Sequence, residues 1–197
     1  MVKSLLLGTI LGGLVAFVWS SISWEVLGWH EKSFHRFQNE DEVSAIISSH
    51  ATGPGVYLLP SGPSLDGMKG EQKKAAQAVL MAKMQKGPIL FGALRTDGFG
   101  SYGRGLLTQV LSLMAAAFLL TWLVLQTSGL SYAKRVVFLG VVGLAASVIV
   151  DLPNWNWWGF SGSFTIVNLV DCTLTWVIAG LVIAKVAKPR TLPLQNV

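Results

Sequence analysis

The first candidate for chemistry in this chain is a row of polar side chains inside the apolar stretch 164–184. Asn168, Asp171 and Thr175 recur at spacings of three and four, so they share one face of a helix. A carboxyl group at the centre of a spanning helix costs roughly 2.5–3.5 kcal/mol to insert, so this row must face protein, a water-filled cavity or a partner. It predicts either a site for an ion, proton or small molecule, or a neutral carboxyl that holds helices together by hydrogen bonds.

A second group of polar and aromatic residues lies at one predicted membrane surface, after the first and third apolar stretches. Its members are Glu25, Trp29, His30, Asp151, Asn154 and Trp155. Carboxylates, an imidazole and aromatic rings at one depth fit a site for a lipid headgroup, a quinone or the edge of a haem. They equally fit an ordinary aromatic belt at the interface. An enzyme acting on lipid would require Glu25, His30 and Asp151 to meet.

The histidines and the cysteine form no recognisable metal-binding pattern. His30 and His35 are five residues apart, which does not stack two imidazoles on one helix face, and a His-Glu-x-x-His motif is absent. Cys172 is the single cysteine, so neither an intramolecular disulfide nor a cysteine-based metal site is expected. No nucleophile elbow or phosphate-binding loop occurs. We therefore predict no catalytic residue, metal or cofactor, and favour a non-enzymatic role.

Four apolar stretches must position these residues: 5–22, 106–125, 136–150 and 164–184. Hydrophobic residues make up 52% of the 197 positions and charged residues only 13%, against roughly 25% charged residues in soluble domains. About 20 apolar residues cross a bilayer, and three of the four stretches approach that length. The third is shorter, and the sequence 152–162 that follows it is interpreted as a turn.

The charges that flank these stretches predict an orientation. Three of the flanking segments hold basic residues and no acidic ones, namely Lys3, Lys134, Arg135, Lys185, Lys188 and Arg190. Cations in short loops mark the cytoplasmic side, so both termini are predicted to lie in the cytoplasm. The net charge of +5 is then explained by contact with anionic lipid headgroups rather than by nucleic acid.

Small residues recur every four positions in the first stretch, at Gly8, Gly12, Ala16 and Ser20. Such a stripe lets another helix approach closely, and close van der Waals contact drives helix association in lipid. The stripe predicts a packing groove. Two occupants remain open, a helix of the same chain or a helix of a partner or second copy.

The segment 29–104 is predicted to form a small α/β domain outside the cytoplasm. Helices are expected at 40–49, capped by Asn39, and at 71–86. Strands are expected at 56–59, as a buried strand, and at 89–94. The order strand, helix, strand favours a right-handed βαβ crossover. A domain of this size exposes too much apolar surface to be stable alone, which predicts that it leans on another surface.

Several short segments, mainly in the first third of the chain, occur in a distinctive combination. They are Gly12-Gly13, Trp19, Ile22-Ser23-Trp24, Gly28-Trp29-His30, the acidic helix start at 39–43, and Gly55-Val56-Tyr57-Leu58-Leu59-Pro60. This combination resembles an uncharacterised group of small bacterial integral membrane proteins. The resemblance implies a bacterial inner-membrane location and transfers no activity or site residue.

These observations predict an all-α membrane protein, a four-helix transmembrane bundle with a small α/β extracytoplasmic insertion between helices 1 and 2. Its segments would be 1–28 (helix 1), 29–104 (the extracytoplasmic domain), 105–187 (helices 2–4) and 188–197 (a cytoplasmic tail). We expect a non-enzymatic accessory or scaffold protein that contacts lipid and docks a membrane-protein partner or second copy through helix 1 and the domain. The alternative is a transport or ligand-binding protein using Asp171 and Asn168.

Overall fold

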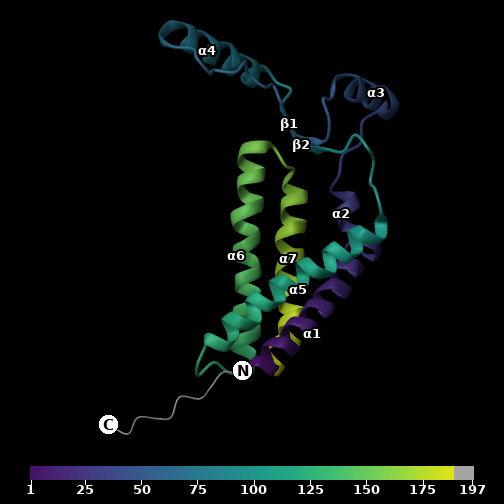
Figure 1. The fold of residues 1–197 in the computed structure, drawn as a ribbon, viewed down its shortest axis with the longest axis vertical. Coiled ribbons are helices and arrows are strands. Elements are labelled where there is room, and N and C mark those ends of the chain that lie inside the picture. The colour runs from purple at the N-terminus through teal and green to yellow at the C-terminus, as the bar shows by residue number, and fades with distance from the viewer. Residues whose placement is uncertain (189–197) are drawn as a thin grey trace. The chain divides into compact units, whose positions relative to one another are not determined.

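The structure is a computed structural model that describes residues 1–188 and is mostly helical (Figure 1). The predicted tail beyond Lys188, including Arg190, lies outside the described residues. The chain divides into two compact units. The helical unit comprises Met1–His35, Ser101–Trp155 and the chain from Phe160 onward, and the insert unit comprises Arg36–Gly100 and Asn156–Gly159.

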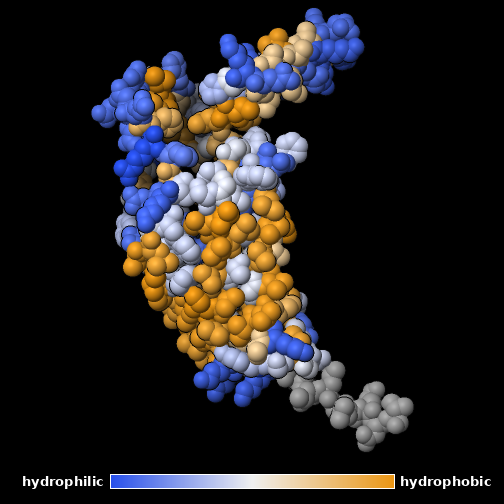
Figure 2. Space-filling view, turned by 180° about the vertical axis from the view of Figure 1, so that it is seen from behind, coloured by the Kyte–Doolittle hydropathy of each residue, from blue (hydrophilic) through white to orange (hydrophobic). Residues whose placement is uncertain are grey.

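Four long helices are apolar enough to cross a membrane, which identifies a multi-pass membrane protein by length and composition. They are α1 (Val2–Ser21), which continues into the π-helix η1 (Ile22–Val26), α5 (Tyr102–Gln126), α6 (Tyr132–Trp158) and α7 (Gly162–Val186). Figure 2 shows hydrophobic residues covering most of the helical unit on the face drawn. Apolar side chains thus cover the outer surface of these helices, as expected for helices surrounded by lipid.

The third apolar stretch is longer than predicted, and the predicted turn 152–162 is wrong. α6 continues as a helix through Pro153 to Trp158. Proline is tolerated in spanning helices because neighbouring groups satisfy the carbonyl that it leaves unpaired. The helix ends at Gly159, whose φ of 73° belongs to the left-handed region that glycine adopts without strain. The turn therefore shrinks to the residues between Trp158 and Gly162.

The stripe of small residues on α1 faces α5 and α7 of the same chain. Gly8, Gly12 and Ala16 are buried, and Ser20 is partly buried. A Cβ atom at Gly12 would lie 2.5 Å from the Ile183 side chain, and one at Gly13 would lie 2.9 Å from the Met114 Cα atom. Only glycine permits so close an approach of the helices. Between Gly8 and Ala16 this face therefore leaves no room for a helix from another protein.

α6 packs on α7 by the same principle. A Cβ atom at Gly143 would lie 2.7 Å from the Trp176 side chain, and the Cys172 thiol lies 3.3 Å from the Gly143 carbonyl oxygen. At the other end of the pair, the Arg135 guanidinium donates to the Ala187 carbonyl at 2.9 Å. A cation at this position satisfies an unpaired carbonyl at the end of α7. The start of α6 therefore lies beside the end of α7.

The insert unit holds the two predicted helices and the two predicted strands. Its elements are α3 (Glu40–His50), β1 (Gly55–Leu59), α4 (Gly70–Lys86) and β2 (Leu90–Leu94). The predicted cap of α3 is confirmed, since the Asn39 side chain accepts a hydrogen bond from the Glu42 backbone N–H. The same side chain donates to the Glu42 carboxylate at 2.9 Å, so the reciprocal pair fixes where α3 begins.

The predicted right-handed βαβ crossover is wrong, because β1 and β2 pair antiparallel. Tyr57 lies opposite Gly92, and Val56 lies opposite Ala93. A crossover requires its helix to pack against the sheet, whereas α4 has no buried residue. The prediction of a buried strand at 56–59 is also wrong, since Val56 is 69% exposed. The sheet has two strands among the described residues, and Phe91 of β2 stacks on the Trp158 ring with 4.4 Å between centroids.

Candidate functional site

The end of α1 folds back on itself and brings polar side chains into the helical unit. η1 is one wide turn, closed by the hydrogen bond from the Leu27 N–H to the Ile22 carbonyl at 3.1 Å. Gly28 follows with a φ of 63°, a value that favours glycine. The short helix α2 (Trp29–Lys32) begins directly after it. This reversal places His30 over the residues of η1.

His30 meets Asp171 of α7 in the interior of the helical unit. Its Nε2 atom lies 3.1 Å from Asp171 Oδ2, and Trp19 Nε1 donates to Asp171 Oδ1 at 2.8 Å. His30 is 1% exposed and Asp171 9% exposed. Because a carboxylate can only accept hydrogen bonds, we assign the hydrogen to Nε2 of the imidazole. Both carboxylate oxygens are thus satisfied by donors from α1 and α2, which tie these elements to α7.

Aromatic rings and one hydroxyl surround the imidazole. The Trp24 ring stacks on it with 4.0 Å between centroids and 6° between planes. Trp29 meets it edge-on and donates through Nε1 to Ser23 Oγ at 2.9 Å. Ser23 Oγ in turn lies 3.2 Å from His30 Nε2. The imidazole is therefore contacted on one face by Trp24, at its edge by Trp29, and at Nε2 by hydrogen bonds.

Serine, histidine and aspartate come together here, but they do not form a hydrolytic triad. In such a triad the serine and the carboxylate contact opposite nitrogens of the imidazole. Here Ser23 and Asp171 both contact Nε2. The Nδ1 atom is buried and has no hydrogen-bond partner within residues 1–188. Ser23 is 0% exposed, so a substrate has no access to its hydroxyl.

The predicted polar row on α7 divides between two networks. Asn168 donates through Nδ2 to Asp151 Oδ1 of α6 at 3.4 Å, and the Ser147 hydroxyl donates to the other oxygen of Asp151. Thr175 donates to the backbone carbonyl of Asp171 at 2.8 Å. Neither Asn168 nor Thr175 therefore hydrogen-bonds the Asp171 carboxylate. Trp19 and His30 take that role.

The predicted outer group of polar and aromatic residues is distributed over separate places. His30 and Trp29 belong to the Asp171 network, and Asp151 belongs to the network on α6. Within residues 1–188, no hydrogen bond or salt bridge joins any two of Glu25, His30 and Asp151. Glu25 lines a pocket between α1 and α5. The Asn154 carbonyl accepts from the Phe160 N–H, and Trp155 is 53% exposed.

Trp19 and Ser23 are members of the site that the sequence reasoning missed. They lie one helical turn apart, so the signal was a pair of donors on one face of α1. A lone carboxyl in a spanning helix needs donors, and the indole N–H of Trp19 is one. His30 was predicted in the outer group and not beside Asp171, because it follows the first stretch and only the turn at Gly28 brings it back to Asp171.

Among residues 1–188, no three side chains of histidine, cysteine, aspartate or glutamate converge as metal ligands would. No protein-family model matches the chain, and neither a curated protein nor a solved structure is significantly similar to it. Function must therefore be inferred from the geometry of the chain itself.

Proposed function

We propose that this chain is a non-enzymatic accessory or scaffold protein of the bacterial cytoplasmic membrane. Four helices anchor it, both termini lie in the cytoplasm, and the insert unit lies on the opposite side. The insert unit docks on another membrane protein or on a second copy of the chain. The small-residue stripe of α1 takes no part in docking, because α5 and α7 of the same chain already occupy it.

The observation that supports this proposal is the exposure of apolar side chains throughout the insert unit. None of its helices or strands contains a buried residue. In α3, α4, β1 and β2, the large hydrophobic residues that are more than half exposed are Ile46, Val56, Leu59, Val79 and Met81. Burying apolar surface stabilises by about 25 cal/mol per Å². A unit that buries so little of it within the chain gains stability when a protein surface covers it.

The orientation is supported by the charges at one end of the helical unit. Lys134 and Arg135 begin α6, Lys185 ends α7, and the Arg135 guanidinium contacts the last turn of α7. These cations therefore gather at the same end of the α6–α7 pair. A cysteine introduced at Ser131 should be labelled only after the membrane is made permeable to a hydrophilic reagent. Labelling from outside intact cells would reverse the orientation.

Mass measurement after gentle extraction of the intact chain tests the docking role. We expect a protein mass above the 21.2 kDa of one chain. Val79→Lys, which places a charge on the exposed apolar surface of α4, should reduce the assembly to a single chain. Gln77→Lys introduces the same charge at an exposed polar position of α4 and should leave the mass unchanged. A monomeric native protein would contradict the proposal.

A transport or ligand-binding role at the buried network is the second candidate. It is favoured by the Nδ1 atom of His30, which is buried without a hydrogen-bond partner in the described part of the chain. A buried polar atom of this kind costs free energy unless a ligand or water satisfies it. Proton or solute flux into vesicles containing the intact protein should then fall in Asp171→Asn. Equal flux in the native protein and the variant would eliminate this role.

A further inference from the structure

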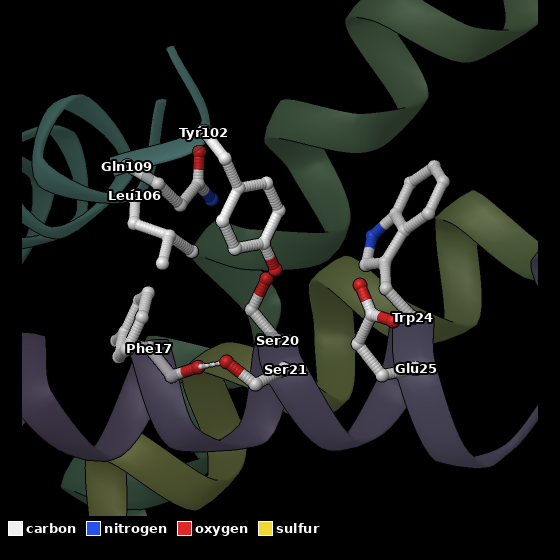
Figure 3. A pocket seen from close by; sticks show the side chains of 8 residues that line it. All are labelled: Phe17, Ser20, Ser21, Trp24, Glu25, Tyr102, Leu106 and Gln109. Carbon is white, nitrogen blue, oxygen red and sulfur yellow. Dashed lines mark hydrogen bonds between the residues drawn. The ribbon is translucent and has the colours of Figure 1, made fainter. Parts of the chain in front are cut away.

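A pocket of about 500 Å³ lies between the end of α1 with η1 and the start of α5 (Figure 3). It belongs entirely to the helical unit. Besides two serines, its lining residues are Phe17, Trp24, Glu25, Tyr102, Leu106 and Gln109. The buried His30–Asp171 network does not line it, although Trp24 belongs to both.

The end of the pocket near η1 is rich in oxygen atoms and carries one negative charge. Glu25 is the only charged residue in the lining, and its carboxylate makes no hydrogen bond or salt bridge within residues 1–188. Figure 3 shows the Tyr102 hydroxyl directed toward Ser20 across the space between the helices. The Ser20 and Tyr102 oxygens and the Glu25 carboxylate are all hydrogen-bond acceptors.

These groups match a primary ammonium ion. An ammonium has three N–H donors, which the oxygens of Glu25, Ser20 and Tyr102 can accept. The indole ring of Trp24 adds a face that attracts cations. A quaternary ammonium has no N–H group and could donate a hydrogen bond to none of these oxygens. An anionic headgroup finds no cationic side chain in the lining.

The other end of the pocket lies deeper along both helices and is lined by Phe17, Leu106 and the carboxamide of Gln109. Phe17 precedes Glu25 by eight residues, roughly 12 Å along a helix axis at 1.5 Å per residue. Leu106 lies one turn into α5 from Tyr102. Gln109 lies three residues beyond Leu106 along α5, and its carboxamide has no hydrogen-bond partner in residues 1–188. An amide at membrane depth requires a polar partner, and an ester carbonyl is one.

We propose that this pocket binds a phospholipid with an ethanolamine headgroup. The ammonium lies among Glu25, Trp24 and Tyr102, and an ester carbonyl accepts a hydrogen bond from Gln109. The linker between the ammonium and the ester passes Leu106 on α5, and an acyl chain packs against Phe17 on α1.

Lipid binding to the intact, delipidated protein tests this assignment. Phosphatidylethanolamine, phosphatidylcholine and phosphatidylglycerol with identical acyl chains are added singly, and native mass spectrometry measures the bound fraction. We expect phosphatidylethanolamine to bind most tightly. Glu25→Gln should weaken it roughly tenfold or more, a factor equivalent to 1.4 kcal/mol, and should abolish the preference. Glu40→Gln removes the same charge from α3, outside the pocket, and should change nothing.

A second variant and a competition measurement complete the experiment. Tyr102→Phe removes one acceptor and should weaken phosphatidylethanolamine severalfold, which provides a readout if Glu25→Gln fails to fold by far-UV circular dichroism. Millimolar free ethanolamine should not displace the lipid, because it lacks the ester and the chain. Equal binding of all three lipids, unchanged binding in both variants, or displacement by ethanolamine alone would overturn the proposal.

Discussion

Asp171→Asn provides the sharpest test of the buried network, because the substitution keeps shape and removes charge. Trp19 Nε1 can only donate, so the oxygen of the new amide must remain on Trp19. The amide NH₂ group then faces His30 Nε2, which must give up its hydrogen to accept. That hydrogen moves to Nδ1, which is buried and has no partner within residues 1–188. One buried N–H is therefore left unpaired.

An unsatisfied buried donor costs about 1–3 kcal/mol. Because the native Nδ1 is already an unpaired acceptor, we expect Asp171→Asn to lower the free energy of unfolding by up to that amount. Asp151→Asn is the matched control. Asp151 also accepts from two side chains, but one of them is the Ser147 hydroxyl. A hydroxyl can reverse its role and accept from the new amide, while Asn168 continues to donate. The control should therefore cost about 1 kcal/mol or less.

Unfolding of the intact protein in mild detergent, titrated with sodium dodecyl sulfate and followed by far-UV circular dichroism, measures both values. Circular dichroism reports helix content and is independent of the charge at either position. The reasoning is refuted if Asp171→Asn unfolds with the native free energy. Equal losses in the two variants would also refute it, since they would show that hydrogen-bond reversibility does not decide the cost.

The remaining predictions concern packing, capping and the stacked ring. Gly12→Ala should destabilise by about 1–3 kcal/mol through overpacking against α7, whereas Gly105→Ala, a helical position with open space, should not destabilise in the same titration. Asn39→Ala should cost α3 about 0.5–2 kcal/mol, visible as faster amide hydrogen exchange confined to α3. Trp24→Leu should lose the stack on His30, about 0.5–1.5 kcal/mol, and should also weaken lipid binding. A loss of stability with unchanged lipid binding would separate the two roles of this ring.

The sequence predicts the long helices well because each carries a continuous apolar signal. Its failures have local causes. The segment 152–162 was predicted to be a turn, yet α6 continues through Pro153, which a spanning helix tolerates, and Gly159 follows its last residue. In the insert unit, apolar strands suggested burial and a crossover, but apolar strands in so small a unit can remain uncovered. Strand direction depends on where the connecting helix packs, and α4 packs with no buried face.

The candidate site was predicted in parts but not as one network. Asp171 stood out because a carboxyl in an apolar helix is costly, and His30 stood out at the end of the first stretch. Their meeting depends on the wide turn of η1 and on the left-handed Gly28. Neither follows from apolar periodicity, which assumes regular helix geometry through Val26. Insertion or deletion of one residue in that turn would rotate His30 away from α7.

Adjacent residues of η1 point into two different environments at this end of the helical unit. Ser23 and His30 are buried toward α7 with Asp171, whereas Glu25 lies in the pocket beside α5. Trp24, between them, stacks on His30 and lines the pocket. Its ring cannot shift to accommodate a ligand without disturbing the stack that orients the imidazole. The ordered buried network therefore keeps the pocket formed before a ligand binds. The protein then loses less conformational entropy when the ligand enters.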